Sequence, residues 1–477
     1  MIRLRPLAVS ALAAVLSTTL LTPSTPASAA GNAVTPINMA SFTTTHPGDA
    51  NSVRLRAIMR NSNRYALTTW YDTVKDFDAQ TGAYLTFGGT AEDKIRPAAA
   101  EAFGLAVSLK LGVYQTGNNS NPNPTTAVAK ARTTRLIGSL AYQHRVNTAG
   151  GWGNAWQSAH WAAFAGFAGW LMWDDLSVTD REYVRRMVES EANRFSSYTV
   201  PYYRTEAGAF VTPGDTKAEE NAWNAQLLQV ATAMMPTHAN YQTWMNKAIE
   251  LELSATARPQ DVASTTVVNG RTLDTWLNGS NVNSDGTVVN HDRIHPDYSE
   301  AIAMTTHAGL VYSMTRTPTP RAAMFNADVV YDALVDEEHV AGTNPYSADP
   351  KITYTVAAPG GTIYEDGTAD IYYPHPNDWG TQRRMQFATM DVMADAFGFD
   401  TLASQKGAYW EPLHAQKVFD MQNRFADGHT YTGNYWDAGS EDTYPGREEW
   451  VAHHAGWAYL ARWIKFQGAF TTTNQAY

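Results

Sequence analysis

Residues 155–173 read Ala-Trp-Gln-Ser-Ala-His-Trp-Ala-Ala-Phe-Ala-Gly-Phe-Ala-Gly-Trp-Leu-Met-Trp, without a single Asp, Glu, Lys or Arg. A helix that is apolar all round must be buried on every side, in a protein core or in a membrane. The length alone would admit a membrane span. However, Gln157, Ser158 and His160 cluster at one end and no basic flank follows. We therefore predict an inner helix of a helical assembly.

Outward from this stretch, apolar residues recur with a helical period along most of the chain. Candidate helices lie at 51–76, 91–112, 124–146, 155–173, 179–196, 217–235, 239–255, 297–315, 320–339, 381–397, 410–425 and 447–467. Twelve helices joined mostly by short links suggest six hairpins. We predict a mainly α protein, an (α/α)6 toroid of helical hairpins, in which two long loops (about 256–296 and 340–380) carry minor β structure and function.

The N-terminal segment has the pattern of a secretory signal. Arg3 and Arg5 precede an apolar run at 7–21, and Ala-Ser-Ala at 27–29 is a small-x-small cleavage site. We expect residues 1–30 to be a signal peptide, 31–50 a loose lead-in and 51–477 a single toroid domain. The protein is then secreted and extracellular. The sequence contains no cysteine, so its core has to be stable without disulfides.

The net charge and the aromatic content limit the classes of molecule that the protein is expected to bind. The formal charge is −11, and removal of the two signal arginines leaves 46 acids against 33 bases, or −13. Such a field disfavours nucleic acid and anionic membranes, so an anionic substrate has to be held by local cations. The 15 Trp and 24 Tyr of this exported chain suit the stacking of sugar rings, although an aromatic core would also account for them. We expect a polysaccharide partner, no nucleic acid and no membrane after signal cleavage; the oligomeric state is not predicted.

Few stretches of the sequence offer as many proton-transfer groups as residues 283–298, which read Asn-Ser-Asp-Gly-Thr-Val-Val-Asn-His-Asp-Arg-Ile-His-Pro-Asp-Tyr. His291 and Tyr298 are side chains that can take and return a proton near neutral pH. Arg293 could neutralise a carboxylate and lower the pKa of its neighbours. The alternative is an ordinary polar loop with a structural histidine.

Three other groups of residues are candidates for the site, but each could have a purely structural role instead. That role would be a polar side chain hydrogen-bonded within an inner helix, an acid that complements a helix dipole, or an exposed charge on a loop. They are Trp156, Gln157 and His160; Glu220, Asn221, Trp223 and Asn224; and Tyr373, His375, Trp379 and Arg383. The chain contains no H-E-x-x-H, G-x-S-x-G or phosphate-loop pattern, and residues 281–285 lack the other ligands of a calcium loop. No metal or cofactor is predicted.

The order of these motifs resembles that of the (α/α)-toroid polysaccharide lyases, of the chondroitin/hyaluronate-lyase-like and heparinase-II/III-like kinds. A Trp-rich helix comes first, then an Asn-bearing helix, then Asp-Gly-x-x-x-x-His at 285–291 and a tyrosine shortly after. The resemblance implies that Asn221 or Asn224 helps to neutralise a uronate carboxylate. It implies that His291 removes the C5 proton and that Tyr298 protonates O4, with Arg293 as a carboxylate or tyrosinate partner.

Two other functions remain open. A glycoside hydrolase on the same toroid would use Glu220 or Glu365 as general acid and Asp292, Asp297 or Asp366 as base. A non-catalytic glycan-binding protein would need only the Trp and Tyr side chains. The large β-sandwich that usually follows the lyase toroid is not indicated by the sequence pattern, which keeps these alternatives in view.

Overall fold

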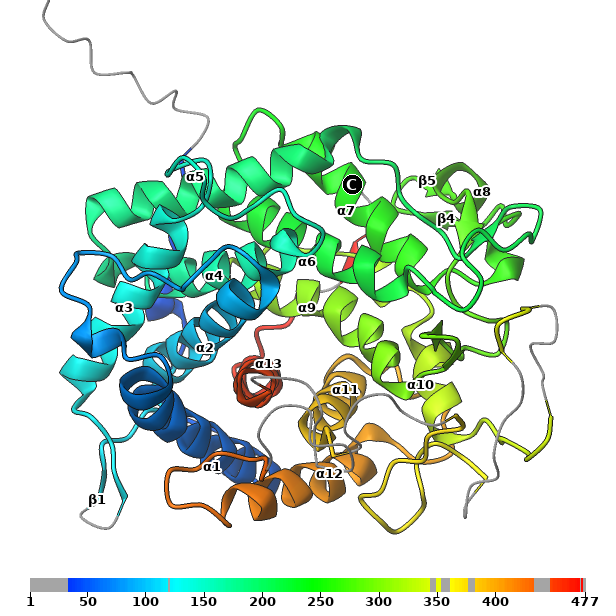
Figure 1. The fold of residues 1–477 in the computed structure, drawn as a ribbon. Coiled ribbons are helices and arrows are strands. Elements are labelled where there is room, and N and C mark those ends of the chain that lie inside the picture. The colour runs from blue at the N-terminus through cyan, green and yellow to red at the C-terminus, as the bar shows by residue number, and fades with distance from the viewer. Residues whose placement is uncertain are drawn as a thin grey trace, which may run out of the picture.

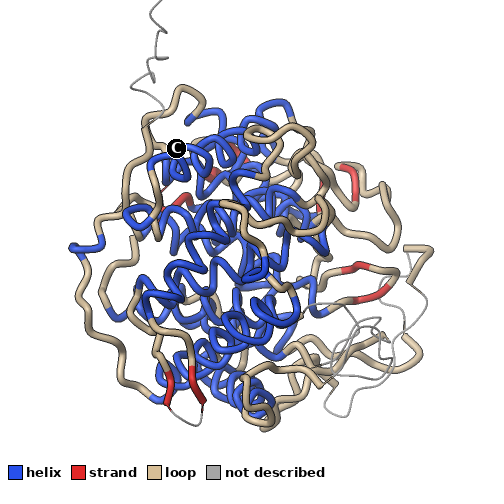
Figure 2. The backbone as a smooth tube through the Cα atoms, turned by 60° about the vertical axis from the view of Figure 1, so that its left-hand side comes forward, coloured by secondary structure: helices blue, strands red, loops and turns tan. Residues whose placement is uncertain are grey.

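The computed structural model describes residues 33–118, 121–343, 349–352, 361–375, 382–432, 447–471 and 473–474. The expected signal peptide and Trp379 lie outside these ranges. Within them, helices make up the body of the molecule and the strands are short pieces in loops (Figure 2).

The helices coincide with the predicted ranges, apart from their ends. They are α1 (Ala50–Tyr65), α2 (Glu92–Lys110), α3 (Thr126–Tyr142), α4 (Ser158–Leu171), α5 (Val178–Arg194), α6 (Ala218–Met234), α7 (Tyr241–Thr256), α8 (Leu273–Trp276), α9 (Ala301–Ser313), α10 (Ala327–Val335), α11 (Arg384–Phe397), α12 (Gly407–Gln422) and α13 (Glu448–Phe466). The one-turn α8 was not predicted. The range 320–339 is the poorest match, because Asn326 adopts a left-handed φ of 51° and separates a 3-10 turn from α10.

The strands pair locally, as two-residue pieces. The antiparallel pairs are β1 (Gly117–Asn118) with β2 (Asn121–Pro122), β3 (Arg204–Thr205) with β6 (Gly279–Ser280), β4 (Val267–Val268) with β5 (Arg271–Thr272), and β7 (Val289–Asn290) with β8 (Arg293–Ile294). β9 (Thr319–Pro320) pairs in parallel with β10 (Thr473–Asn474). Five of these strands lie in the first predicted loop, 256–296.

Helix contacts define a closed ring. α2, α4, α6, α9, α11 and α13 each contact the next helix in this order, and α13 contacts α2 again. The outer helices α3, α5, α7, α10, α12 and α1 pack, respectively, on α2, α4, α6, α9, α11 and α13. This arrangement is the predicted (α/α)6 toroid (Figure 1).

Helix α4 is an inner helix, as its sequence predicts, because all of its residues are buried. Its glycines allow the outer helix α5 to approach closely. A Cβ at Gly166 would lie 2.6 Å from a methyl group of Val188, and one at Gly169 would lie 2.8 Å from a methyl group of Val184. In the part of the chain that the structure describes, none of the helices has the length and apolar character needed to cross a membrane.

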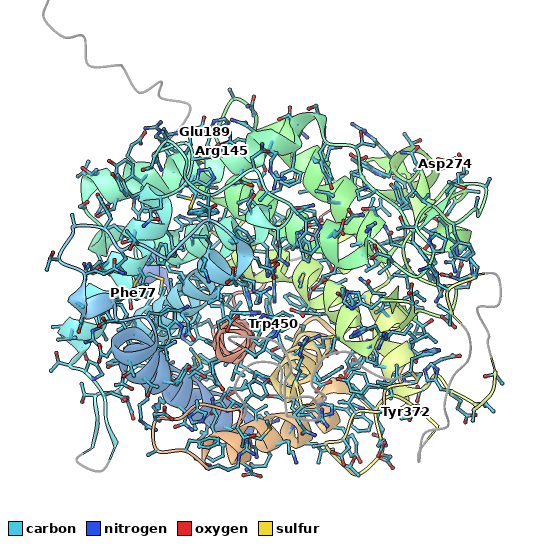
Figure 3. All side chains as sticks on the ribbon, viewed as in Figure 1. Phe77, Arg145, Glu189, Asp274, Tyr372 and Trp450 are labelled. Atoms are coloured by element: carbon cyan, nitrogen blue, oxygen red, sulfur yellow. The ribbon has the colours of Figure 1, made fainter. Side chains whose placement is uncertain are left out.

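The inner helices bring their N-terminal turns to the same end of the ring. The His160 ring near the start of α4 lies 6.0 Å from Trp223 of α6 and 6.4 Å from His453 of α13. Arg96 of α2 lies over Trp450 of α13, which Figure 3 places near the middle of the ring. Since turns near the same helix terminus meet, α2, α4, α6 and α13 run in parallel. Their positive dipole ends therefore share one mouth of the toroid.

Because α2 and α13 lie close together, we can predict how an added methyl group at Gly104 changes the stability of the fold. A Cβ at Gly104 would lie 2.9 Å from the Ala452 carbonyl oxygen, and a backbone group has little freedom to move. We expect Gly104→Ala to lower the free energy of unfolding by about 1–3 kcal/mol, despite the better helix propensity of alanine. Denaturant unfolding measures the change. Gly48→Ala is the control, because a Cβ there meets nothing within 4 Å; equal effects of both variants would contradict the packing argument.

Buried Glu252 of α7 predicts a pH dependence of stability. One of its oxygens accepts a hydrogen bond from Gln229 Nε2 (3.0 Å), and burial raises its pKa from 4.5 to about 8. The folded protein therefore holds a proton that the unfolded chain releases above pH 4.5, so this contribution to stability is lost as the pH rises from 4.5 to 8. The loss is on the order of 3–5 kcal/mol.

We expect Glu252→Gln to flatten the fall in unfolding free energy over this window, as measured by denaturant titration at a series of pH values. Glu250→Gln is the matched control on the same helix, because the Glu250 carboxylate is ion-paired to Lys247 and remains in contact with water. An unchanged slope in Glu252→Gln would show that this carboxyl group does not bind a proton on folding.

Candidate active site

A tight β-hairpin carries the predicted histidine. β7 and β8 are joined by the two residues His291 and Asp292, with left-handed φ values of 50° and 62°. Positive φ at both positions defines a type I′ turn, which follows the twist of the strands. The Asp292 N–H donates to the Gly214 carbonyl oxygen (2.9 Å) and the Thr216 N–H to that of Val289 (2.9 Å). The turn is thus tied to the start of α6.

His291 and Tyr298 form a direct pair. Tyr298 Oη lies 3.1 Å from His291 Nε2, and the ring centroids are 5.4 Å apart. The 3-10 turn Pro296–Glu300, which precedes α9, places the tyrosine opposite the hairpin. The backbone N–H of His291 donates a hydrogen bond to the side-chain oxygen Asn290 Oδ1 (2.7 Å). The structure therefore brings together the two residues that the sequence singled out for proton transfer.

The pair faces a cavity of about 420 Å³ at the mouth of the ring. Its lining residues are Trp156, Gly214, Asp215, Thr216, Glu219, Glu220, Trp223, Asn290, His291, Asp292 and Tyr298. Trp156 is 61% exposed and meets the Trp223 ring edge-on at 4.9 Å. An exposed indole face beside a proton-transfer pair can hold a sugar ring in place.

Carboxyl groups also line the cavity. Burial raises the pKa of Glu219 to about 8, and the neighbouring Glu220 adds to the rise. The shift favours the protonated form of Glu219, which can donate a hydrogen bond. Lys217 bridges Asp215 (2.8 Å) and Glu220 (3.2 Å).

Polar residues outside the cavity lining contact the hairpin and the turn that follows it. His295 Nδ1 lies 3.5 Å from Asp297 Oδ2, and Tyr373 Oη donates to Asp297 Oδ1 (3.4 Å). Burial, with the Asp297 charge beside it, holds the pKa of Tyr373 well above its usual value. The His375 Nδ1 accepts the Ile294 N–H (3.2 Å). Tyr373 and His375, predicted to bind substrate, are therefore placed in the support of the hairpin and not in the cavity wall.

The asparagines of α6 lie away from the cavity. Asn221 donates its amide hydrogens to the Pro201 carbonyl oxygen and to Ser254 Oγ, both at 3.0 Å, which ties α6 to α7. Asn224 is buried and is absent from the cavity lining. Asn290 lines the cavity instead. The only signal for it in the sequence was its position directly before His291.

Gln157 and His160 are buried behind the aromatic wall. Gln157 Oε1 accepts the Trp161 indole N–H (3.0 Å). His160 Nδ1 lies 2.8 Å from Gln226 Oε1, and burial lowers the pKa of His160 to about 3, so the ring is neutral. Neither side chain reaches the cavity lining.

The two predicted arginines are placed differently. Arg293 Nε donates to the His291 carbonyl oxygen (2.8 Å), which braces the left-handed turn. Arg383, just before α11, lies over the Trp450 ring at 4.7 Å. Within the described ranges, His, Asp and Glu side chains form no group of three that could hold a metal ion.

Comparison with known proteins adds little. The chain matches no protein-family model and no curated protein. Among solved structures it is similar to an unsaturated glucuronyl hydrolase mutant from Streptococcus agalactiae. The match has 11% sequence identity and a TM-score of 0.42, and it covers 91% of this chain and 98% of that chain. At this distance the similarity carries no argument, so the fold rests on the helix contacts and the chemistry on the cavity.

The contact between the hairpin and Gly214 predicts how the histidine is positioned. Gly214 has a φ of +76°, and a Cβ there would lie 2.1 Å from Asp292 Oδ1 and 3.1 Å from Asp292 Cα. We expect Gly214→Ala to displace the turn, break the His291–Tyr298 hydrogen bond and lower the unfolding free energy by about 2–4 kcal/mol.

Gly208→Ala is the matched control for this variant. Gly208 has a φ of +82°, but a Cβ there has no neighbour within 4 Å, so backbone strain of about 1 kcal/mol is the only expected cost. Crystal structures and denaturant unfolding of both variants separate strain from displacement. A hairpin that keeps its place in Gly214→Ala would contradict this prediction.

Proposed function

We propose that the protein is a polysaccharide lyase that cleaves a uronate-containing glycan by β-elimination. The observation that carries the proposal is the His291–Tyr298 pair, hydrogen-bonded at 3.1 Å on the wall of a cavity with an exposed tryptophan. Elimination needs one group that removes a proton and one that supplies a proton, and no water. A neighbouring histidine and tyrosine meet this need.

In the proposed reaction, His291 and Tyr298 together take up and return every proton that is transferred. The Tyr298 hydroxyl turns from His291 towards O4 of the bound uronate, which frees Nε2 to take the C5 proton. The electrons of the C5–H bond form the new C4–C5 double bond, the C4–O4 bond breaks, and Tyr298 gives its proton to O4. The proton on His291 Nε2 then passes to Tyr298 Oη along their hydrogen bond, which restores both groups.

The C5 proton becomes acidic only if the uronate carboxylate is neutralised. Asn290 is the asparagine that lines the cavity. Its side-chain carbonyl oxygen accepts a hydrogen bond from the backbone N–H of His291. Its NH2 group remains to donate to the substrate. Asn290 therefore suits this role better than Asn221 or Asn224. Protonated Glu219 supplies a second neutral donor at the same wall.

A glycoside hydrolase is the second candidate function. The observation that favours it is the raised pKa of Glu219, which lines the cavity. A carboxyl group with a pKa of about 8 is a suitable general acid, and Asp292 lines the same cavity as a possible base. Of the other predicted carboxylates, Glu220 lines the cavity in an ion pair, and Asp297 lies behind the hairpin. Glu365 and Asp366 are absent from the cavity lining, and Asp366 binds Tyr409 Oη (2.6 Å).

Product analysis separates the two reactions. With uronate-containing polysaccharides, we expect products that absorb in the ultraviolet through a 4,5-unsaturated uronate and that take up no heavy oxygen from labelled water. His291→Ala and Tyr298→Phe should each lower kcat on the order of 10²–10⁴-fold. Tyr372→Phe is the control, since Figure 3 places Tyr372 far from the ring centre.

Labelled reducing ends without ultraviolet absorbance, abolished by Glu219→Gln and retained in Tyr298→Phe, would establish hydrolysis and reject elimination. Binding of the polysaccharide without either product would reject both enzymatic functions.

A further inference from the structure

One buried carboxylate, that of Glu191 on the outer helix α5, is surrounded by four hydrogen-bond donors. Its Oε1 accepts the backbone N–H of Asn154 (2.7 Å) and lies 3.2 Å from His144 Nε2. Its Oε2 accepts the Ser158 hydroxyl (2.8 Å) and the Arg194 Nε–H (3.0 Å). A buried carboxylate is costly unless its lone pairs are satisfied, and here both oxygens are satisfied.

These partners keep Glu191 ionised. Burial by itself would raise its pKa, but His144, the Arg194 charge and the Asn154 N–H lower the pKa to about 2. His144 Nδ1 accepts the backbone N–H of Val146 (3.3 Å), which leaves Nε2 as the ring nitrogen that donates to Glu191. All the partners therefore donate, and an amide in place of the carboxylate would present its own N–H groups to some of them.

The loop before α4 is folded closely around this carboxylate. We call residues 153–157 the tryptophan loop, because they carry Trp156. Gly153 has a φ of +120°. A Cβ at Gly153 would lie 2.3 Å from His144 Nε2 and 3.0 Å from Glu191 Oε1, so a larger residue would have to displace the loop.

Few other contacts fix the tryptophan loop. Within the described ranges, Glu191 and Arg194 are the only side chains of another helix that hydrogen-bond to the loop or to Ser158. Arg194 reaches Ser158 Oγ only at 3.5 Å. Trp156 is itself 61% exposed and meets Trp223 edge-on, so burial does little to hold it. The position of the indole therefore depends chiefly on the bonds to Glu191.

We propose that Glu191 is a positioning residue for substrate binding, whose carboxylate holds the tryptophan loop so that Trp156 presents its ring to a sugar unit in the cavity. Trp156 lines the same cavity as His291 and Tyr298. A loop that is already held in its binding shape raises affinity, because little ordering is left to be done on binding. The stacking of a glycan rests on the proposed function, but it does not depend on whether elimination or hydrolysis follows.

The first test compares Glu191→Gln with the unaltered protein. In crystal structures we expect the tryptophan loop to shift while α4 keeps its place. Hyaluronan, alginate and polygalacturonate serve as uronate-containing probes in affinity electrophoresis and in turnover assays. For the probe that binds tightest, the dissociation constant and KM should rise on the order of 3–10-fold, and kcat should change by less than about twofold.

Glu182→Gln is the matched control on the same helix. The Glu182 carboxylate is ion-paired to Arg185 and half of its side chain is exposed, so its loss should leave both the loop and the binding of the probes unchanged.

A double-variant cycle shows whether Glu191 acts through the indole. Trp156→Ala alone should weaken binding on the order of tenfold. Glu191→Gln should then add little further loss in the Trp156→Ala background, because the group that it positions is already absent. Losses that multiply independently would mean that Glu191 affects binding by another route, and would overturn the inference.

Ser158→Ala is the milder variant, used if circular dichroism shows that Glu191→Gln does not fold. It removes one bond to the carboxylate and keeps the others, so binding should weaken in the same direction by a smaller factor. The inference is overturned if the loop keeps its place in the folded variant, if that variant binds every probe as the unaltered protein does, or if no probe binds the unaltered protein.

Failure of the proposed function alone would look different. The unaltered protein would bind a probe and Glu191→Gln would bind it more weakly, but no unsaturated product would form.

Discussion

Ring closure depends on the contact between α2 and α13, helices separated by most of the chain. At this contact Gly104 lies against the backbone of Ala452, and Phe103 packs on Trp457 with ring centroids 4.4 Å apart. The absence of a side chain at residue 104 brings the two backbones together. The same contact sets the position of Trp450 and of the two histidines that follow it on α13. Packing in the ring thus positions the polar groups at its mouth.

The sequence was sufficient to predict the toroid because the relevant signal is local. Helical periodicity and the charge-free stretch 155–173 depend only on neighbouring residues, and both agree with the structure. His291 and Tyr298 could be paired because they are seven residues apart, joined by a hairpin and a short turn. The ends of α10 could not be predicted, since they depend on the left-handed conformation of Asn326.

The remainder of the candidate site could not be predicted from sequence because it depends on contacts between distant segments. A polar residue on an apolar helix, such as Asn221, suggests a functional role. In the structure, however, its amide hydrogen-bonds to Ser254 Oγ and to the Pro201 carbonyl oxygen. Asn290 gave little signal of its own. The raised pKa of Glu219 requires burial that only the closed ring supplies. Arg96 stands in ordinary helical sequence, and only the packing of α2 against α13 brings it to Trp450.

Closure by the last helix also has a consequence for the order of folding. A chain that ends before α13 lacks the helix that both α2 and α11 contact. Their inner faces then remain uncovered, and contacts over such sequence separations form slowly. Every earlier hairpin can pack on its neighbour, yet the ring cannot close in any intermediate without α13. The inner faces of α2 and α11 that meet α13 are therefore covered only when the C-terminal helix packs between them.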